Sequence, residues 1–150
     1  MEKVLFYINE IHRGLYIDAI SLTYIDTFRW ENPIEPIPLK EIFNEDALPK
    51  SLYDSNDIFT LSLNKISQKN NQEYNNQLDI DVRKIRETEP YTKLSVIHTV
   101  NLLAYTEDLG DILANSWIEQ SLEFAHQINK EKMKELFKEN ICLEKMNLKI

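Results

Sequence analysis

Cysteine and glycine are scarce in this 150-residue chain, which has a single Cys142 and only two glycines, Gly14 and Gly110. One cysteine excludes an internal disulfide, which fits a reducing compartment, and we expect a cytoplasmic protein. Two isolated glycines exclude the glycine clusters with which dinucleotide-binding and P-loop motifs cradle phosphates. No run of about 18 apolar residues and no signal-peptide pattern is present, so we expect no membrane-spanning segment.

Basic charge is also in short supply, because 17 Lys and Arg face 25 Asp and Glu, for a net charge of −8. Residues 31–57 hold seven acids against two lysines, and residues 107–123 hold five acids and no basic residue. Such blocks disfavour a nucleic-acid partner and favour a protein with a basic surface. The candidate partner-binding acids are Glu31, Glu35, Glu45, Asp46, Asp54, Asp57, Glu107, Asp108 and Asp111.

Alternating apolar and polar residues indicate β-strands in the first two thirds of the chain. The runs at residues 59–63 and 78–82 alternate with period two and predict an antiparallel hairpin over about 58–86. The polar stretch 67–77 between them predicts a long, mobile connecting loop. Residues 15–30 are rich in Thr, Tyr, Ile, Phe and Trp, which favours a strand, although their spacing also fits a helix.

Helical spacing of apolar residues predicts helices near both ends of the chain. We expect a short helix at residues 1–14, helical turns at 40–44 and 48–53 beyond the proline-rich segment, and longer helices at 92–105 and 111–128, broken at Gly110. A further helix is predicted at 130–139, followed by a terminal strand or a frayed helix at 146–150. The predicted fold is a single α+β domain over residues 1–150. Its antiparallel sheet packs against a C-terminal helical layer (about 92–139), with an all-α fold carrying a β-hairpin insertion as the alternative.

Two constellations could hold a metal ion. Glu123 and His126 form an E-x-x-H pair on one helix face, but the bundles that bind iron this way need the motif twice. Asp57, Asp79 and Asp81 could hold a divalent metal in a nuclease-like site. The alternation of Asp79 and Asp81 with apolar residues already accounts for them as the solvated face of a sheet.

The remaining chemically interesting side chains favour structural roles. His98 lies in a very apolar segment, where a hydrogen-bonded core histidine is the usual finding. Asn101 interrupts the same segment and needs a partner if buried. Cys142 lies between two apolar residues, which suits an inert buried thiol.

These observations favour a small, acidic, non-catalytic binding protein with no cofactor. An inhibitor or immunity-type protein that neutralises a basic protein is the sharpest form of this hypothesis. Two alternatives remain open: the metal-dependent, nuclease-like enzyme, and a structural subunit of a homo-oligomer whose aromatic surface pairs with itself.

Overall fold

The computed structural model describes residues 18–32, 34–53, 58–86, 88–103, 116–144 and 146. They form an α+β fold with one four-stranded antiparallel sheet, which confirms the predicted fold class. The elements in chain order are β1 (Ala19–Trp30), α2 (Leu39–Ile42), α3 (Lys50–Tyr53), β2 (Phe59–Lys69), β3 (Gln72–Ile85), β4 (Tyr91–Leu103), α5 (Trp117–Leu136) and α6 (Glu139–Glu144). The predicted helix at 1–14 and the end of the chain after residue 146 lie outside the described residues.

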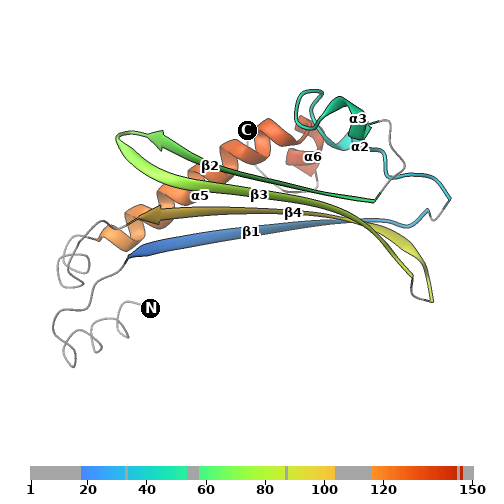
Figure 1. Cartoon of the computed structure of the whole chain (residues 1–150), viewed down its shortest axis with the longest axis horizontal. Helices are drawn as coiled ribbons and strands as arrows, with labels where there is room; N and C mark the ends of the chain where they lie inside the picture. Colours follow the sequence, from blue (N-terminus) through green and yellow to red (C-terminus); the bar gives the residue numbers. More distant parts are fainter. Residues whose placement is uncertain are drawn as a thin grey trace.

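The sheet has the strand order β1-β4-β3-β2, and every neighbouring pair is antiparallel (Figure 1). The strand expected at 15–30 is confirmed as β1, and the hairpin expected at 58–86 is confirmed as β2 and β3. One row of the sheet runs from Tyr24 through His98 and Leu78 to Leu63, so the central strand β4 links the N-terminal strand to the hairpin.

The hairpin ends in a tight turn, and the prediction of a long loop at 67–77 is wrong. Pairing continues to Lys69 opposite Gln72, with only Asn70 and Asn71 between them. Both asparagines have positive φ angles, of 52° and 62°. Asparagine tolerates this left-handed conformation better than most residues, and two such residues give a turn whose twist matches the strands. A polar run is therefore compatible with a long paired hairpin.

The predicted helix at 92–105 is also wrong, because residues 91–103 form strand β4. Leu94, Val96, Val100 and Leu102 alternate along one face of this strand, and all four are buried. Ile97 on the opposite face made the segment look apolar all round. β-Branched residues favour a strand here, and β4 pairs on both sides.

The helical layer begins at Trp117, and α5 is one continuous helix of 20 residues in place of the two expected at 111–128 and 130–139. Its buried stripe includes Ile118, Ala125, Ile128 and Met133, and it continues through the polar Asn129. Asn129 finds a partner in the sheet, His98 on β4, so this polar residue is accommodated within the buried stripe. Among the described helices, none is long and apolar enough to cross a membrane.

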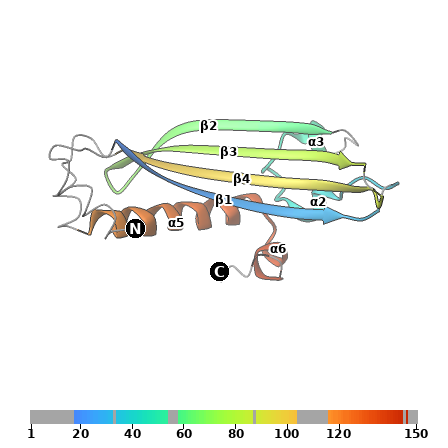
Figure 2. The same ribbon diagram turned by 90° about the horizontal axis from the view of Figure 1, so that it is seen from below.

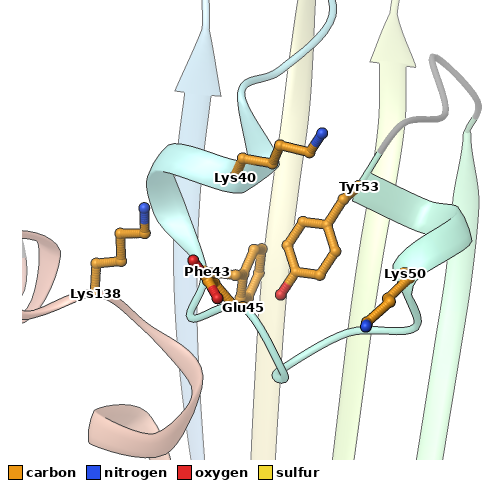
Figure 3. A pocket seen from close by; sticks show the side chains of 6 residues that line it. All are labelled: Lys40, Phe43, Glu45, Lys50, Tyr53 and Lys138. Carbon is orange, nitrogen blue, oxygen red and sulfur yellow. The ribbon is translucent and has the colours of Figure 1, made fainter.

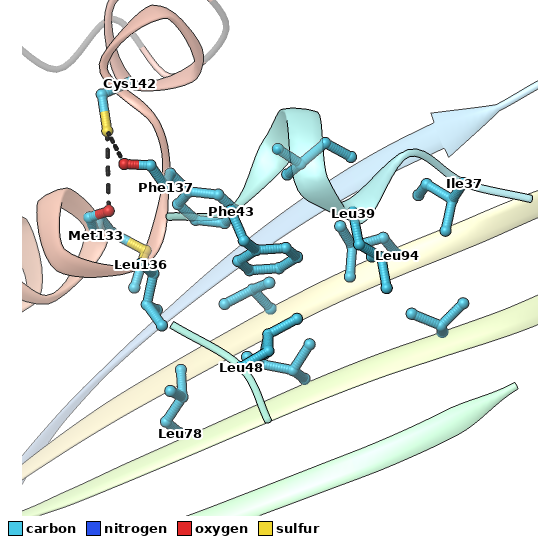
Figure 4. Packing of buried hydrophobic residues seen from close by; sticks show 14 residues of the cluster. Ile37, Leu39, Phe43, Leu48, Leu78, Leu94, Met133, Leu136, Phe137 and Cys142 are labelled. Carbon is cyan, nitrogen blue, oxygen red and sulfur yellow. Dashed lines mark hydrogen bonds between the residues drawn. The ribbon is translucent and has the colours of Figure 1, made fainter. Parts of the chain in front are cut away.

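The described helices lie on one side of the sheet, with α5 running along the strands and α2, α3 and α6 beyond its C-terminal end (Figures 1 and 2). The larger core cluster lies between the sheet and the short helices beyond the end of α5. There Phe43 stacks on Phe137 with a ring-centroid distance of 5.1 Å (Figure 4). A smaller cluster around Ala125 and Val100 lies under α5. The helical side of the sheet is therefore where cavities can form between elements.

Candidate binding surfaces

The first acidic block does not form a uniformly acidic surface. Exposed Glu31 pairs with Arg29 at 3.5 Å. Glu45 lines a cavity together with three lysines, and Glu35 and Asp46 are exposed on the segments around α2. The other predicted acids, Asp54, Asp57, Glu107, Asp108 and Asp111, lie outside the described residues.

The described part of the second acidic block lines a surface cavity of about 600 Å³, which we call the α5 groove. It lies between residues 119–131 of α5 and the end of the β2–β3 hairpin. Its described lining residues are Lys69, Asn70, Glu119, Gln120, Glu123, Phe124, Gln127 and Glu131. Among them, three glutamates face this cavity against one lysine.

Two local features build the groove. The tight turn at Asn70 and Asn71 keeps the hairpin paired to its tip, which brings Lys69 to the helix. Lys69 Nζ then contacts both carboxylate oxygens of Glu131 at 2.5 Å, which ties the hairpin to α5. Glu131 is paired with Lys69, and Glu119 and Glu123 bring two further carboxylates to the described lining of the groove.

Phe124 lines the groove beside its carboxylates. Phe124 meets Tyr74 edge to face, with ring centroids 5.7 Å apart. Gln127 donates a hydrogen bond to Glu123 at 2.8 Å, which fixes that carboxylate on the helix surface. Burial, and then the negative charge of Glu123, raises the pKa of the neighbouring Tyr24. The field of Glu123 therefore reaches beyond the groove to the edge strand.

The E-x-x-H pair does not form a metal site in the described structure. His126 Nδ1 is hydrogen-bonded to the hydroxyl of Tyr24 at 2.7 Å, while Glu123 accepts from Gln127. Within the described ranges, no group of three His, Cys, Asp or Glu residues could hold a metal ion. The two side chains serve instead to connect α5 with β1 and with itself.

Asp79 and Asp81 lie on the face of the hairpin opposite the helices, as their alternation predicted. Ser62 donates to Asp79 at 2.5 Å, and Thr60 donates to Asp81 at 2.7 Å. Burial alone would raise the pKa of Asp81, but hydrogen bonds from Thr60 and Arg83, with nearby positive charges, lower it overall. These carboxylates are anchored by their strand neighbours, and Asp57, their proposed third partner, lies outside the described residues.

His98 is a fully buried histidine at the centre of β4, a strand where the sequence predicted a helix. Its Nδ1 lies 2.8 Å from Oδ1 of Asn129 on α5, and its Nε2 lies 2.6 Å from Oδ1 of Asn76 on β3. Burial lowers the pKa of His98, and the hydrogen bond to Asn129 offsets only part of this effect. A neutral imidazole carries one N–H, so it can donate to only one of these two amide oxygens. His98 therefore joins the sheet to the helix, as the predicted hydrogen-bonded core residue.

Asn101 and Cys142 also have structural environments. Asn101 lies half-buried on the open face of β4 and accepts a hydrogen bond from Ser21 on β1. The Cys142 thiol is buried, and burial raises its pKa, which disfavours the reactive thiolate. Its Sγ lies 3.8 Å from the carbonyl oxygen of Met133, as expected for an inert core thiol (Figure 4).

The sequence located the second acidic block but did not single out its groove-lining members. Glu119 and Glu123 are four residues apart, and that spacing puts them on one helix face. Phe124 and the hairpin residues Lys69 and Asn70 gave no such signal, because their proximity to α5 depends on the tight turn. In comparisons with protein-family models, curated proteins and solved structures, the chain has no significant match. Its function therefore has to be inferred from the residues themselves.

Proposed function

We propose that this chain is a non-catalytic cytoplasmic binding protein whose α5 groove receives a basic segment of another protein. The observation that carries the proposal is the position of Glu119 and Glu123 on a cavity of about 600 Å³ that Phe124 also lines. A cavity of this size accommodates several side chains, and its volume falls within the range of known binding sites.

The carboxylates and the aromatic ring of the groove would contact different parts of the partner's basic side chains. The carboxylates would accept hydrogen bonds from Lys or Arg of the partner, while Phe124 would contact their aliphatic stems. The net charge of −8 would accelerate encounter with a basic protein and would make that encounter sensitive to salt. An inhibitor or immunity-type role follows if the bound segment belongs to the partner's own functional site.

The test is affinity capture from the native host at low and at high salt, with mass analysis of the bound proteins. The wild-type chain is compared with the double variant Glu119→Gln/Glu123→Gln. The matched control is Glu139→Gln/Glu144→Gln, which removes two exposed charges from α6. We expect one stoichiometric basic partner that salt releases, that the groove variant loses and that the α6 variant keeps.

Two results would contradict the proposal. Capture of the same partner by the groove variant at wild-type yield would place the interaction elsewhere. Absence of any stoichiometric partner at low salt would remove the binding function itself. Where a partner is captured, crosslinking of the complex through Lys69 shows whether that partner occupies the groove.

A further inference from the structure

A second cavity lies beyond the C-terminal end of α5 and has the opposite charge character. It has a volume of about 360 Å³ and is lined by Lys40, Phe43, Glu45, Lys50, Tyr53 and Lys138 (Figure 3). We call it the lysine cavity. Its lysines come from three separate parts of the chain: α2, the start of α3, and the junction between α5 and α6.

The lysines are brought together by a specific backbone connection. Phe43 and Phe137 form an isolated antiparallel bridge, and on either side of it Asn44 N–H donates to Leu136 O and Lys138 N–H donates to Ile42 O. The Asn44 side-chain amide also lies 3.1 Å or less from three carbonyl oxygens at the end of α5. The last carbonyls of a helix lack partners within it, so the two N–H donors of an amide some 90 positions away cap this helix end. The cavity is therefore built on a fixed frame.

The aromatic wall of the cavity is also held in place. The Tyr53 hydroxyl donates to the carbonyl of Asn44 and accepts from the N–H of Leu48 at 3.2 Å. These two bonds fix the plane of the Tyr53 ring, which remains half-buried, while Phe43 beneath is fully covered. The ring of Tyr53 is thus the apolar surface that a ligand can reach.

Charge defines what such a ligand must be. In Figure 3, Lys138, Lys40 and Lys50 lie on different sides of the aromatic pair, and Glu45 is the one acid among the lining residues that the structure describes. Lys50 and Lys138 each bring an ammonium group to the described lining of the cavity, and an anion placed between them would be attracted to both. The flexible lysine stems can turn their charges inward without moving the frame.

We propose that the lysine cavity binds a small organic anion that carries a planar ring. The ring lies against Tyr53, and the anionic group is held by Lys50 and Lys138, with Lys40 at the rim. The volume of about 360 Å³ lies at the lower end of the range for small-molecule sites, which suits a single-ring ligand. This site is separate from the α5 groove, so the two proposals stand or fall independently.

The experiment is a titration of the whole chain with phenyl phosphate, followed by isothermal calorimetry and by the amide NMR signals of residues 40–53 and 138. Benzyl alcohol supplies the ring without charge, and inorganic phosphate supplies the charge without the ring. We expect saturable binding of phenyl phosphate, with affinity at least about tenfold above that of either fragment. Equal binding of inorganic phosphate would overturn the role of the ring.

Variants locate the site. Lys50→Gln/Lys138→Gln should weaken phenyl phosphate binding by about tenfold or more, since two charged hydrogen bonds are lost. The matched control is Lys84→Gln/Arg86→Gln, which removes two exposed charges at the end of β3 and should leave the affinity unchanged. Tyr53→Leu tests the aromatic wall, and its circular dichroism spectrum shows whether the fold survives. Equal affinity in the wild type and the Lys50→Gln/Lys138→Gln variant, or no saturable binding at all, would overturn the proposal.

Discussion

The side chains on the two faces of the sheet are stabilised by different interactions. On the helical face of β4, Leu94, Val96 and Val100 are fully buried beneath the helices. On the open face, the polar side chains bond across strands, as between Thr23 and Thr99 at 2.9 Å. One face is stabilised by exclusion of water and the other by a ladder of hydrogen bonds within reach of water.

This difference explains where the candidate binding surfaces lie. The open face has its hydroxyls and carboxylates already paired with neighbouring strands, as Thr60 is with Asp81. Among the described charged residues that line the two cavities, those of the α5 groove are mainly acidic and those of the lysine cavity mainly basic. Both cavities lie where helices meet strand ends or connecting segments. Helices laid on a sheet leave gaps at their ends, whereas a flat ladder of side chains does not.

The largest difference between the two faces should appear in the free energy of unfolding when an isoleucine is truncated on each of them. Ile80 is fully buried on the helical face of β3, whereas Ile25 on the open face of β1 is 65% exposed. Ile80→Ala should lower the free energy of unfolding by about 2–5 kcal/mol, because it leaves a cavity in the larger core cluster. Ile25→Ala should change it by about 0.5 kcal/mol or less.

Chemical denaturation of both variants measures this contrast. A large loss of stability in Ile25→Ala would show that the open face is covered in solution, by a second copy of the chain or by another part of it. Dependence of that loss on protein concentration would then identify the second copy.

A smaller change in the free energy of unfolding should come from the hydrogen bond between His98 on β4 and Asn129 on α5. Burial holds the pKa of His98 below its ordinary value of 6.5, so the unfolded chain takes up this proton first as the pH falls. Stability should therefore be highest above about pH 6.5 and should decline as the pH falls toward the lowered pKa of the folded state. Asn129→Ala leaves a buried ring nitrogen unpaired and should cost about 1–3 kcal/mol at neutral pH.

The pH dependence is tested by removing the titratable ring itself. His98→Gln should flatten the stability profile between about pH 5 and 7. Thermal unfolding of the wild type and of this variant across the range makes the comparison. An unchanged slope in His98→Gln would assign the pH dependence to other groups.

The sequence predicted those parts of the fold whose signal is local. β1, β2 and β3 were found because each strand alternates or carries strand-forming residues, and Asp79 and Asp81 were assigned to the open face for the same reason. β4 was missed because Ile97 fills the polar phase of its alternation. α5 was predicted as two helices, although its buried stripe runs through Asn129. The cap that Asn44 places on the end of α5 joins residues some 90 positions apart, and no local pattern signals it.

The smallest and most direct test of the two faces compares two aspartates. Asp26 lies on the helical face of β1, where burial raises its pKa, so its charge is disfavoured in the folded state at neutral pH. Asp81 lies on the open face with a lowered pKa, so its charge is favoured and contributes stability above about pH 4.

Asp26→Asn should therefore stabilise the fold and Asp81→Asn should destabilise it, each by about 0.5 kcal/mol, since both groups are in contact with solvent. Added salt should shrink the Asp81→Asn effect, because the ion pair with Arg83 at 2.6 Å is partly screened. It should leave the Asp26→Asn effect almost unchanged, because desolvation is not a screened interaction. Denaturant titrations of both variants at low and high salt provide the measurement. If both variants changed the free energy of unfolding in the same direction, the strand position and not the face of the sheet would determine whether a charged carboxylate is stabilising.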